Sequence, residues 1–310
     1  MKNSSRSVAR WVVTIVLLVC FGVSTAKELG TIKFSFSPGE NISFVQKLTT
    51  LNEKDMGDKG RQLDESVSTT KITMTKTKSG WDVLAEPQSI SMKRNGEEVN
   101  NPIVSLLSSA VITYKLDSDG KIIDIDGYEP FIEGISKQVP PEVFKQLAPV
   151  LNVEAMKAKE IAEWNGRIGD YVGAEFQIGD TLVAETPFQI PNGPTITYSI
   201  QTSIAACVPC GEKKCVLIEQ HYDSQADNLA KKVGDVVSNV SEALAPETKK
   251  PNFGSSSATI KGDVERVIDP ETMLIYEEKV SRTITMEMDV PGVGHVPVKT
   301  TETRKYEFEY

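Results

Sequence analysis

The stretch TITYSIQTSIA, residues 195–205, alternates apolar and polar side chains with a period of two. Its apolar positions are Ile196, Tyr198, Ile200 and Ile204, and its polar positions include Thr197, Ser199, Gln201 and Ser203. Side chains of a strand point alternately to the two sides of a sheet, so this pattern indicates an antiparallel strand with one buried face and one wet face. Threonine, isoleucine and tyrosine are also favoured on such a surface. The stretch therefore predicts a long strand over Thr195–Ala206.

The same alternation recurs along most of the chain. It is found in ISFVQKL (42–48), KITMT (71–75), SISMK (89–93), RTITMEMD (282–289) and KYEFEY (305–310). Residue pairs typical of hairpin turns separate the strand-like segments. These pairs are Ser79-Gly80, Asn95-Gly96, Asp119-Gly120 and Asp269-Pro270. We expect two antiparallel meanders, over residues 27–128 and 170–310.

Two segments break the alternation and are predicted to be helical. Residues 129–164 carry apolar side chains at helical spacing, with Pro141 in a first helical turn and Asn152 as the N-cap of a following helix. In residues 224–245, Ser224 can act as N-cap, and an apolar stripe then repeats every three or four positions. The stripe consists of Ala226, Leu229, Ala230, Val233, Val237, Val240 and Leu244. We expect the helices to pack on the sheet.

This order of elements predicts an α+β fold. We expect residues 27–310 to form a single β-rich domain, a large curved antiparallel sheet or unclosed β-barrel with the helices packed on one face. Methionine accompanies isoleucine on several apolar strand faces, as in Ile72 with Met74 and Ile90 with Met92. Because methionine is flexible and polarizable, such a face suits either core packing or an adaptable binding surface, and the sequence leaves both open.

The first 26 residues have the composition of a secretory signal peptide. Lys2, Arg6 and Arg10 form a positive head, an apolar run follows, and Ser24-Thr25-Ala26 is a small-x-small cleavage pattern. The apolar run is shorter than the about 20 residues that a membrane span needs. We therefore expect cleavage near Ala26, export to the periplasm or the extracellular space, and a mature chain that does not span the membrane.

The chain is acidic, with 34 lysines and arginines, 43 aspartates and glutamates, and a net charge of −9. Removal of the three cations of the leader would bring the net charge to −12. A surface of this sign repels nucleic acid at long range, so we expect no nucleic-acid partner.

Catalytic motifs are scarce. The histidines are His221 and His295, no serine or cysteine lies in a recognisable nucleophile elbow, and no glycine-rich phosphate loop follows a predicted strand. We therefore expect no enzymatic activity and no cofactor.

The stretch CVPCGEKKC, residues 207–215, contains every cysteine that follows Cys20. A redox CxxC motif normally opens a helix in a βαβ unit, whereas this stretch lies between two predicted strands. A structural zinc ion needs four ligands and only three thiolates are present, so no metal site is predicted. In an exported protein a structural disulfide across a hairpin is favoured.

The pairing of these cysteines depends on the hairpin turn. With Glu212-Lys213 as the two turn residues, Cys210 faces Cys215 and a disulfide is within reach. A longer loop would pair Cys207 with Cys215 instead. We expect one disulfide, with Cys210–Cys215 preferred, and one thiol left over.

The architecture resembles that of exported bacterial proteins of the lipoprotein-carrier kind. The resemblance rests on the leader, the two meanders around the inserted helices, the hairpins Asp117–Ile125 and Ile268–Lys279, and the passage EWNGRIGDYVGAEFQIGDTL (163–182). That family has an unclosed β-barrel with a helical lid over an apolar concave face. The resemblance implies a non-enzymatic role in holding an acyl chain or another apolar ligand. No family motif is present, so no binding residue carries over, and the arginine that the family uses inside its cavity has no assigned position here.

Two functions are therefore expected to compete. The first is a carrier that binds a lipid or other apolar ligand in the concave face of the sheet. The alternative is a structural or protein-interaction component of the cell envelope with a solid core. An interior pocket in the range of about 300–1,000 Å³ separates the first from the second. The sequence identifies no protein partner.

Overall fold

The computed structural model describes residues 31–99, 110–138, 141, 144, 152–189, 195–224, 254–290 and 294–310. Thr31–Tyr310 forms one compact unit. The predicted leader, residues 1–26, lies outside the described residues. The predicted helix 224–245 also lies outside them, apart from Ser224, which is the last residue of a strand. No helix in the described part of the chain combines the length and the apolar character that a bilayer crossing requires.

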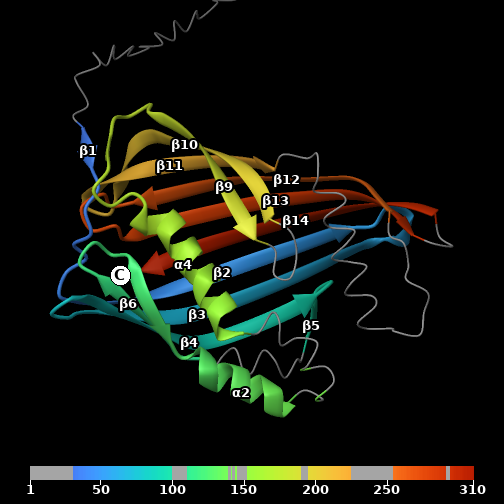
Figure 1. Cartoon of the computed structure of the whole chain (residues 1–310), viewed down its shortest axis with the longest axis horizontal. Coiled ribbons are helices and arrows are strands. Elements are labelled where there is room, and N and C mark those ends of the chain that lie inside the picture. Colours follow the sequence, from blue (N-terminus) through green and yellow to red (C-terminus); the bar gives the residue numbers. More distant parts are fainter. Residues whose placement is uncertain are drawn as a thin grey trace, which may run out of the picture. The chain divides into compact units, whose positions relative to one another are not determined.

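Twelve strands of the described residues form one antiparallel sheet (Figure 1). Its first half contains β2 (Asn41–Asp55), β3 (Arg61–Lys76), β4 (Gly80–Arg94), β5 (Glu97–Glu98), β6 (Ile112–Asp117) and β7 (Ile122–Asp126). Its second half contains β9 (Thr181–Gln189), β10 (Thr195–Cys210), β11 (Lys213–Ser224), β12 (Gly254–Ile268), β13 (Ile275–Val290) and β14 (Gly294–Glu309). The strand order is β7-β6-β4-β3-β2-β14-β13-β12-β11-β10-β9, with β5 paired to β4. The predicted large antiparallel sheet is confirmed, and it stays open, with β7 and β9 as its edges.

The two halves of the sheet are joined by its first long strand and its last strand. β2 and β14 pair in a register that runs from Asp55 opposite Lys299 to Val45 opposite Glu309. The other pairings of the large sheet join strands within the same half. The β2–β14 pairing therefore makes one continuous surface from two meanders.

The two faces of the sheet differ in chemistry, as the alternation predicts. Even-numbered residues of β2, β3 and β14, among them Phe44, Met74 and Tyr306, share the face that we call the inner face. Odd-numbered residues of the same strands form the outer face, where Lys47 lies 3.7 Å from Glu307. Apolar and aromatic side chains are thus gathered on the inner face, which also carries a few charged residues such as Glu302 and Arg304.

Helices occur in the predicted region 129–164. They are α2 (Tyr128–Gln138) and α4 (Val153–Trp164), and α4 continues into a π-helical turn, η2 (Asn165–Gly169). Asn152 caps α4 as predicted, because its side-chain oxygen accepts a hydrogen bond of 2.7 Å from the backbone N–H of Ala155. Figure 1 shows α4 crossing the inner face of the sheet. A short 3-10 helix, η1 (Gly57–Lys59), connects β2 to β3.

A segment that precedes β2 packs across one end of the sheet. Its first residues form β1 (Ile32–Lys33), which pairs with β8 (Glu175–Phe176) in a separate two-stranded sheet. Phe34 follows and is fully buried, with its ring centroid 5.8 Å from that of Tyr171 and 5.7 Å from that of Phe176. We call residues 32–36 the N-terminal strap.

The strap also holds the turn between β12 and β13. The backbone N–H of Ser35 donates a hydrogen bond of 2.8 Å to the carbonyl of Pro270, and its hydroxyl donates one of 2.9 Å to the carbonyl of Glu271. Phe36 packs edge-on against Trp81, with ring centroids 5.0 Å apart. The strap therefore ties the first residues of the unit to both halves of the sheet.

Strand β7 provides a matched test of the two faces. A bulge in its pairing with β6 turns both Ile122 and Ile125 inward, so Ile125 is fully buried while Ile123 is 61% exposed. We expect Ile125→Ala to lower the free energy of unfolding by about 2–5 kcal/mol, because it opens a cavity in the core. Ile123→Ala should change it by less than about 0.5 kcal/mol. Urea unfolding followed by tryptophan fluorescence measures both values, and equal effects would contradict the assignment of the faces.

Candidate ligand-binding cavity

A cavity of about 430 Å³ lies between the inner face and α4. Its floor is formed by β2, β3, β4, β6 and β14, and its roof by α4 and η2. Most of the floor is apolar, and its side chains include Phe44, Ile72, Met74, Val83, Ala85 and Ile112. The volume lies within the range of about 300–1,000 Å³ that is usual for small-molecule sites.

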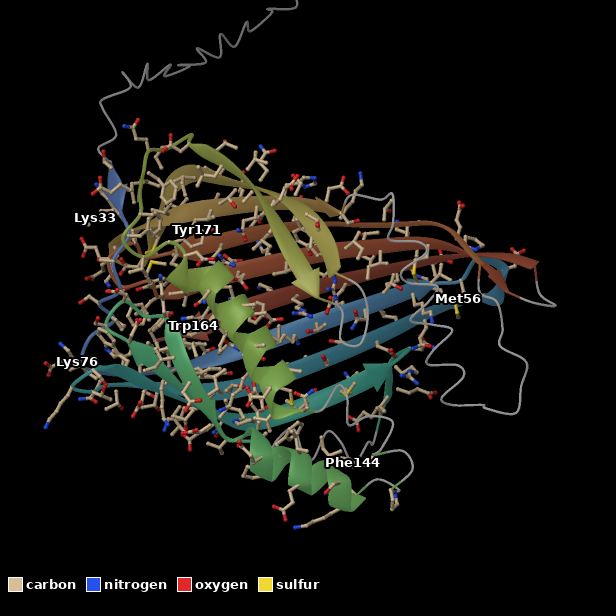
Figure 2. All side chains as sticks on the ribbon, in the orientation of Figure 1. Lys33, Met56, Lys76, Phe144, Trp164 and Tyr171 are labelled. Carbon is tan, nitrogen blue, oxygen red and sulfur yellow. A yellow bond between two sulfur atoms is a disulfide. The ribbon has the colours of Figure 1, made fainter. Side chains whose placement is uncertain are left out.

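Aromatic side chains form part of the cavity wall. Trp164, at the end of α4, stacks on Tyr114 of β6 with ring centroids 6.3 Å apart. The indole N–H of Trp164 donates a hydrogen bond of 2.7 Å to the carbonyl of Gly120. Tyr310, at the C-terminal end of β14, donates from its hydroxyl to the carbonyl of Ile275 at 2.6 Å. Figure 2 shows Trp164 at the strap end of α4, toward Lys33 and away from Met56.

Glu160 projects from α4 toward the cavity and faces β6. The hydroxyl of Tyr114 lies 3.5 Å from its carboxylate. Burial, followed by the negative charge of Glu163, raises the pKa of Glu160 above its ordinary value. Burial and the charge of Glu160 likewise raise the pKa of Tyr114. The carboxyl of Glu160 therefore takes up a proton more readily than an exposed glutamate does.

A cluster of three charged residues, which we call cluster A, lies where η2 meets β12 and β13. Arg266 forms a buried ion pair with Glu278, and the Nε of Arg167 lies 3.3 Å from the same carboxylate. Burial alone would raise the pKa of Glu278, but the charges and hydrogen bonds of the two arginines outweigh it and hold this pKa below its ordinary value. Glu278 is therefore a carboxylate that two cations keep ionised beneath the roof.

A second cluster, cluster B, lies further along the same face. Glu302 of β14 forms ion pairs with Arg282 of β13 and with Arg304, whose terminal amino group lies 2.8 Å from its carboxylate. Arg304 lines the cavity together with its neighbour Tyr306. Charged groups thus lie at one side of an otherwise apolar floor.

The sequence analysis assigned no binding residue to this cavity and found no place for a cavity arginine. Helical spacing was one available signal, since Glu160 and Arg167 are seven positions apart on α4 and η2. Strand alternation was another, since Arg266 shares its parity with Val264 and Ile268. Neither signal identifies the oppositely charged partner of these residues, because ion-pair partners depend on which strands become neighbours.

The predicted methionine faces meet the cavity only in part. Ile72 and Met74 lie on its floor, whereas Ile90 and Met92 are not among its lining residues. The Ile72–Met74 face thus lines a cavity of the described residues.

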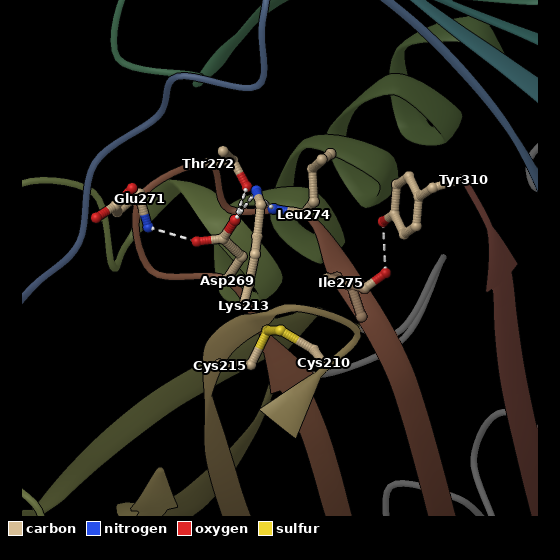
Figure 3. Close-up of a disulfide and its surroundings, with 9 residues drawn as sticks. All are labelled: Cys210, Lys213, Cys215, Asp269, Glu271, Thr272, Leu274, Ile275 and Tyr310. Atoms are coloured by element: carbon tan, nitrogen blue, oxygen red, sulfur yellow. Dashed lines mark hydrogen bonds and ion pairs between the residues drawn. A yellow bond between two sulfur atoms is a disulfide. The ribbon is translucent and has the colours of Figure 1, made fainter. Parts of the chain in front are cut away.

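The cysteine hairpin contains a disulfide between Cys210 and Cys215, with Cα atoms 5.7 Å apart (Figure 3). This is the preferred pair, but the expected turn at Glu212-Lys213 is wrong. Cys210 lies opposite Lys213, and Cys215 lies opposite Val208, so the two cysteines are diagonal neighbours. The turn begins at Gly211, whose φ of +64° suits the two-residue hairpin turns that start with glycine.

The disulfide lies beside the turn between β12 and β13. Lys213 reaches across to Asp269, with a distance of 2.6 Å between the ammonium nitrogen and the carboxylate. Asp269 also accepts hydrogen bonds from the hydroxyl of Thr272 and the backbone N–H of Glu271. Glu271 is the residue whose carbonyl holds Ser35, so the disulfide, the turn and the strap form one connected end of the molecule.

The remaining candidates for chemistry lie apart from the cavity. Cys207 is free and exposed. His221 lies on the outer face with its Nδ1 2.8 Å from Asp263, and the side chain of His295 lies outside the described residues. Within the described part of the chain, no three histidine, cysteine or acidic side chains are arranged to hold a metal ion.

Comparison with known proteins gives a likeness to solved structures and none in sequence. No family model matches the sequence, and no curated protein matches it. A solved structure described as "lipid-protein interactions in lipovitellin" is similar with a TM-score of 0.42 and 9% sequence identity. The alignment covers 89% of this chain and 25% of that one, so this chain spans about a quarter of the length of the other. The likeness is weak and architectural.

Glu278 should make stability depend on pH. Because its pKa is lowered in the folded state, its contribution is present above the ordinary value of 4.5 and is lost as the pH falls through the lower folded value. Glu278→Gln leaves the buried Arg266 and the partly exposed Arg167 without their carboxylate, so we expect a loss of about 3–5 kcal/mol in unfolding free energy at neutral pH. We also expect a shallower decline of stability below pH 4.5 than in the wild type.

Urea unfolding between neutral pH and pH 3 measures both effects. Glu97→Gln, which changes an exposed glutamate of β5, is the matched control and should unfold like the wild type. An acid-induced decline as steep in Glu278→Gln as in the wild type would disprove the role given to this carboxylate.

The cysteine assignment predicts one reactive thiol. In the processed chain, we expect the denatured, unreduced protein to be lighter by two hydrogens than its reduced form, because Cys210 and Cys215 are joined. Iodoacetamide should label the native protein once, at Cys207, and should not label Cys207→Ser. Labelling of the Cys207→Ser variant without reductant would contradict the pairing.

Proposed function

We propose that the protein is a non-enzymatic carrier that binds an apolar or amphipathic ligand in the cavity beneath α4. The supporting observation is the cavity itself, about 430 Å³ of space between an apolar strand floor and a helical roof. Protein interiors that serve only stability are close-packed and hold few voids larger than a water molecule. A space of this size with aromatic and aliphatic walls is suited to an apolar guest.

The polar groups near the cavity favour binding over catalysis. Glu278 and Glu302 are each held by two arginines, so neither is poised to transfer a proton. Glu160 has the hydroxyl of Tyr114 as its neighbour, at 3.5 Å. His221, the histidine whose side chain is described, lies on the outer face of the sheet. The arrangement offers charge and hydrogen bonds to a ligand more readily than it offers an acid–base pair.

Export is part of this proposal. It is supported by the composition of residues 1–26, with a cationic head, an apolar run and a small-x-small site. It is also supported by the disulfide between Cys210 and Cys215, since such bonds persist in oxidising compartments. We place the carrier in the periplasm or outside the cell.

A cavity-filling variant tests the proposal. The full-length sequence is expressed with its own leader in a bacterial host and purified without detergent, and the fluorescent apolar probe N-phenyl-1-naphthylamine is titrated into it. Ala85 lies on the cavity floor, so Ala85→Trp should fill the space and weaken probe binding at least about tenfold, a change of about 1.4 kcal/mol. Native mass spectrometry of the same preparation should show a discrete adduct that organic solvent removes.

Leu84→Trp is the matched control, because Leu84 is the neighbouring residue on the other face of β4, opposite Thr73. We expect this variant to bind the probe as the wild type does. Equal binding by both tryptophan variants would place the probe elsewhere on the protein. A wild type that shows neither an adduct nor saturable probe binding would refute the carrier proposal.

An interaction role at β9 is a second candidate. β9 is an edge of the large sheet, and its adjacent residues Leu182 and Val183 are 51% and 70% exposed. An edge strand with apolar side chains is a template for pairing with another strand. Edge pairing predicts concentration-dependent self-association that Val183→Lys abolishes, and sedimentation at several protein concentrations measures it.

A further inference from the structure

The charged side chains on the inner face are not balanced within their clusters. Cluster A consists of Arg167, Arg266 and Glu278, and cluster B consists of Arg282, Arg304 and Glu302. Two arginines share one carboxylate in each cluster, so each has one positive charge in excess. The apolar floor of the cavity therefore ends against two cationic groups.

One arginine of each cluster lines the cavity, whereas the glutamates of the two clusters do not. The side chains of Arg167 and Arg304 are 28% and 32% exposed, and both line the cavity. The carboxylates are covered, since the side chain of Glu278 is 3% exposed and that of Glu302 is 12% exposed. A ligand in the cavity would therefore meet guanidinium groups whose counter-charges lie behind them.

Arg167 and Arg304 line the cavity together with Tyr306. The guanidinium carbon of Arg167 lies 4.9 Å from the centroid of the Tyr306 ring, and Arg304, two residues before Tyr306 on β14, lines the same cavity. Arg167 uses its Nε–H for Glu278. Among the described residues, the terminal amino groups of Arg167 have no hydrogen-bond acceptor. Arg167 and Arg304 thus both line the part of the cavity that contains Tyr306.

The acidic residues of the roof, Glu160 and Glu163, also line the cavity, but each has a contact other than the two arginines. Glu163 is half exposed and lies 3.7 Å from Lys159 of its own helix. Glu160 faces Tyr114 on β6, at the opposite side of the floor from β14 in the strand order. Burial and the charge of Glu163 also raise the pKa of Glu160 and so favour its neutral form.

We infer that the ligand is a single-chain amphiphile with an anionic head, whose carboxylate or phosphate is bound by Arg167 and Arg304 beside Tyr306. Its apolar chain extends over the floor toward Phe44 and Met74, which also line the cavity. Guanidinium groups present paired N–H donors that match the oxygens of a carboxylate or a phosphate. This inference rests on the proposed carrier function and adds the chemistry of the head group.

Calorimetric titration of the full chain with ligands of equal chain length tests the inference. The ligands are dodecanoate, dodecyl phosphate, 1-dodecanol and dodecyltrimethylammonium, at pH 7 and below their micelle concentrations. We expect both anions to bind at least about tenfold more tightly than the alcohol. The tighter of the two anions identifies the head group. Raising the salt concentration from about 0.05 M to about 1 M should weaken binding of the two anions and leave binding of the alcohol unchanged.

The variant Arg304→Gln distinguishes the contribution of the ligand's head group to binding from that of its apolar chain. The variant leaves Glu302 paired with Arg282, and we expect it to weaken the two anions about tenfold while dodecanol changes by less than about twofold. Arg304→Lys keeps the charge and should retain part of the preference for anions over the alcohol. If Arg304→Gln does not fold, Arg304→Lys still tests the inference. Arg94→Gln is the matched control, because Arg94 forms a similar pair with Asp64, at 2.8 Å, outside the cavity. It should leave every affinity unchanged.

Two results would overturn the inference while the carrier proposal stands. One is equal affinity for the anions and the alcohol, or a preference for the cation. The other is a preference for anions that survives unchanged in Arg304→Gln. If none of the four ligands binds, the carrier proposal fails and the inference fails with it.

Discussion

The cavity depends on the antiparallel pairing of β2 with β14. Phe44 comes from one of these strands and Tyr306 and Phe308 from the other, so the floor is continuous only where the first half of the sheet meets the second. A slip of β14 by one residue would turn Tyr306 and Phe308 outward and bring Lys305 and Glu307 inside. Because such a slip would bury charge and expose aromatic surface, the apolar alternation on both strands holds the register, and the register in turn defines the floor.

Charged residues buried on an apolar face lose their hydration, which costs free energy. This applies to cluster A, which lies beneath α4 and η2. A buried ion pair such as Arg266 with Glu278 gives little net stability compared with apolar side chains of similar size, because both ions lose their hydration. The position of the pair is more informative than its energy. Glu278 also binds the guanidinium of Arg167, which lies over Tyr306 at the cavity wall. The buried glutamate therefore acts as a support that fixes an exposed cation at the edge of the apolar space.

Local pattern predicted the strands, their two faces and the cap at Asn152, because each of these depends on residues close together in the chain. The order of the strands was beyond its reach, since nothing within β2 specifies β14 as its neighbour. The same limit applies to Arg266, whose inward parity is visible in the sequence although its partner Glu278 is not. The hairpin at Gly211 shows a smaller failure, in which the pair of cysteines was expected and the turn was misplaced by one residue because the conformational freedom of glycine was given too little weight.

The N-terminal strap has a consequence for the order of folding. Ser35 bonds to Glu271, which lies 236 positions further along the chain, so some of the first residues made find their partners among the last. Closing so long a loop is entropically costly, and folds dominated by such contacts form slowly. Until β12 to β14 exist, the strap and the apolar positions of β2 have nothing to dock on, and the chain stays open. For a protein that we propose to be exported, this delay is useful, because a chain that cannot finish folding before its C-terminal strands are made stays extended while it is threaded across a membrane.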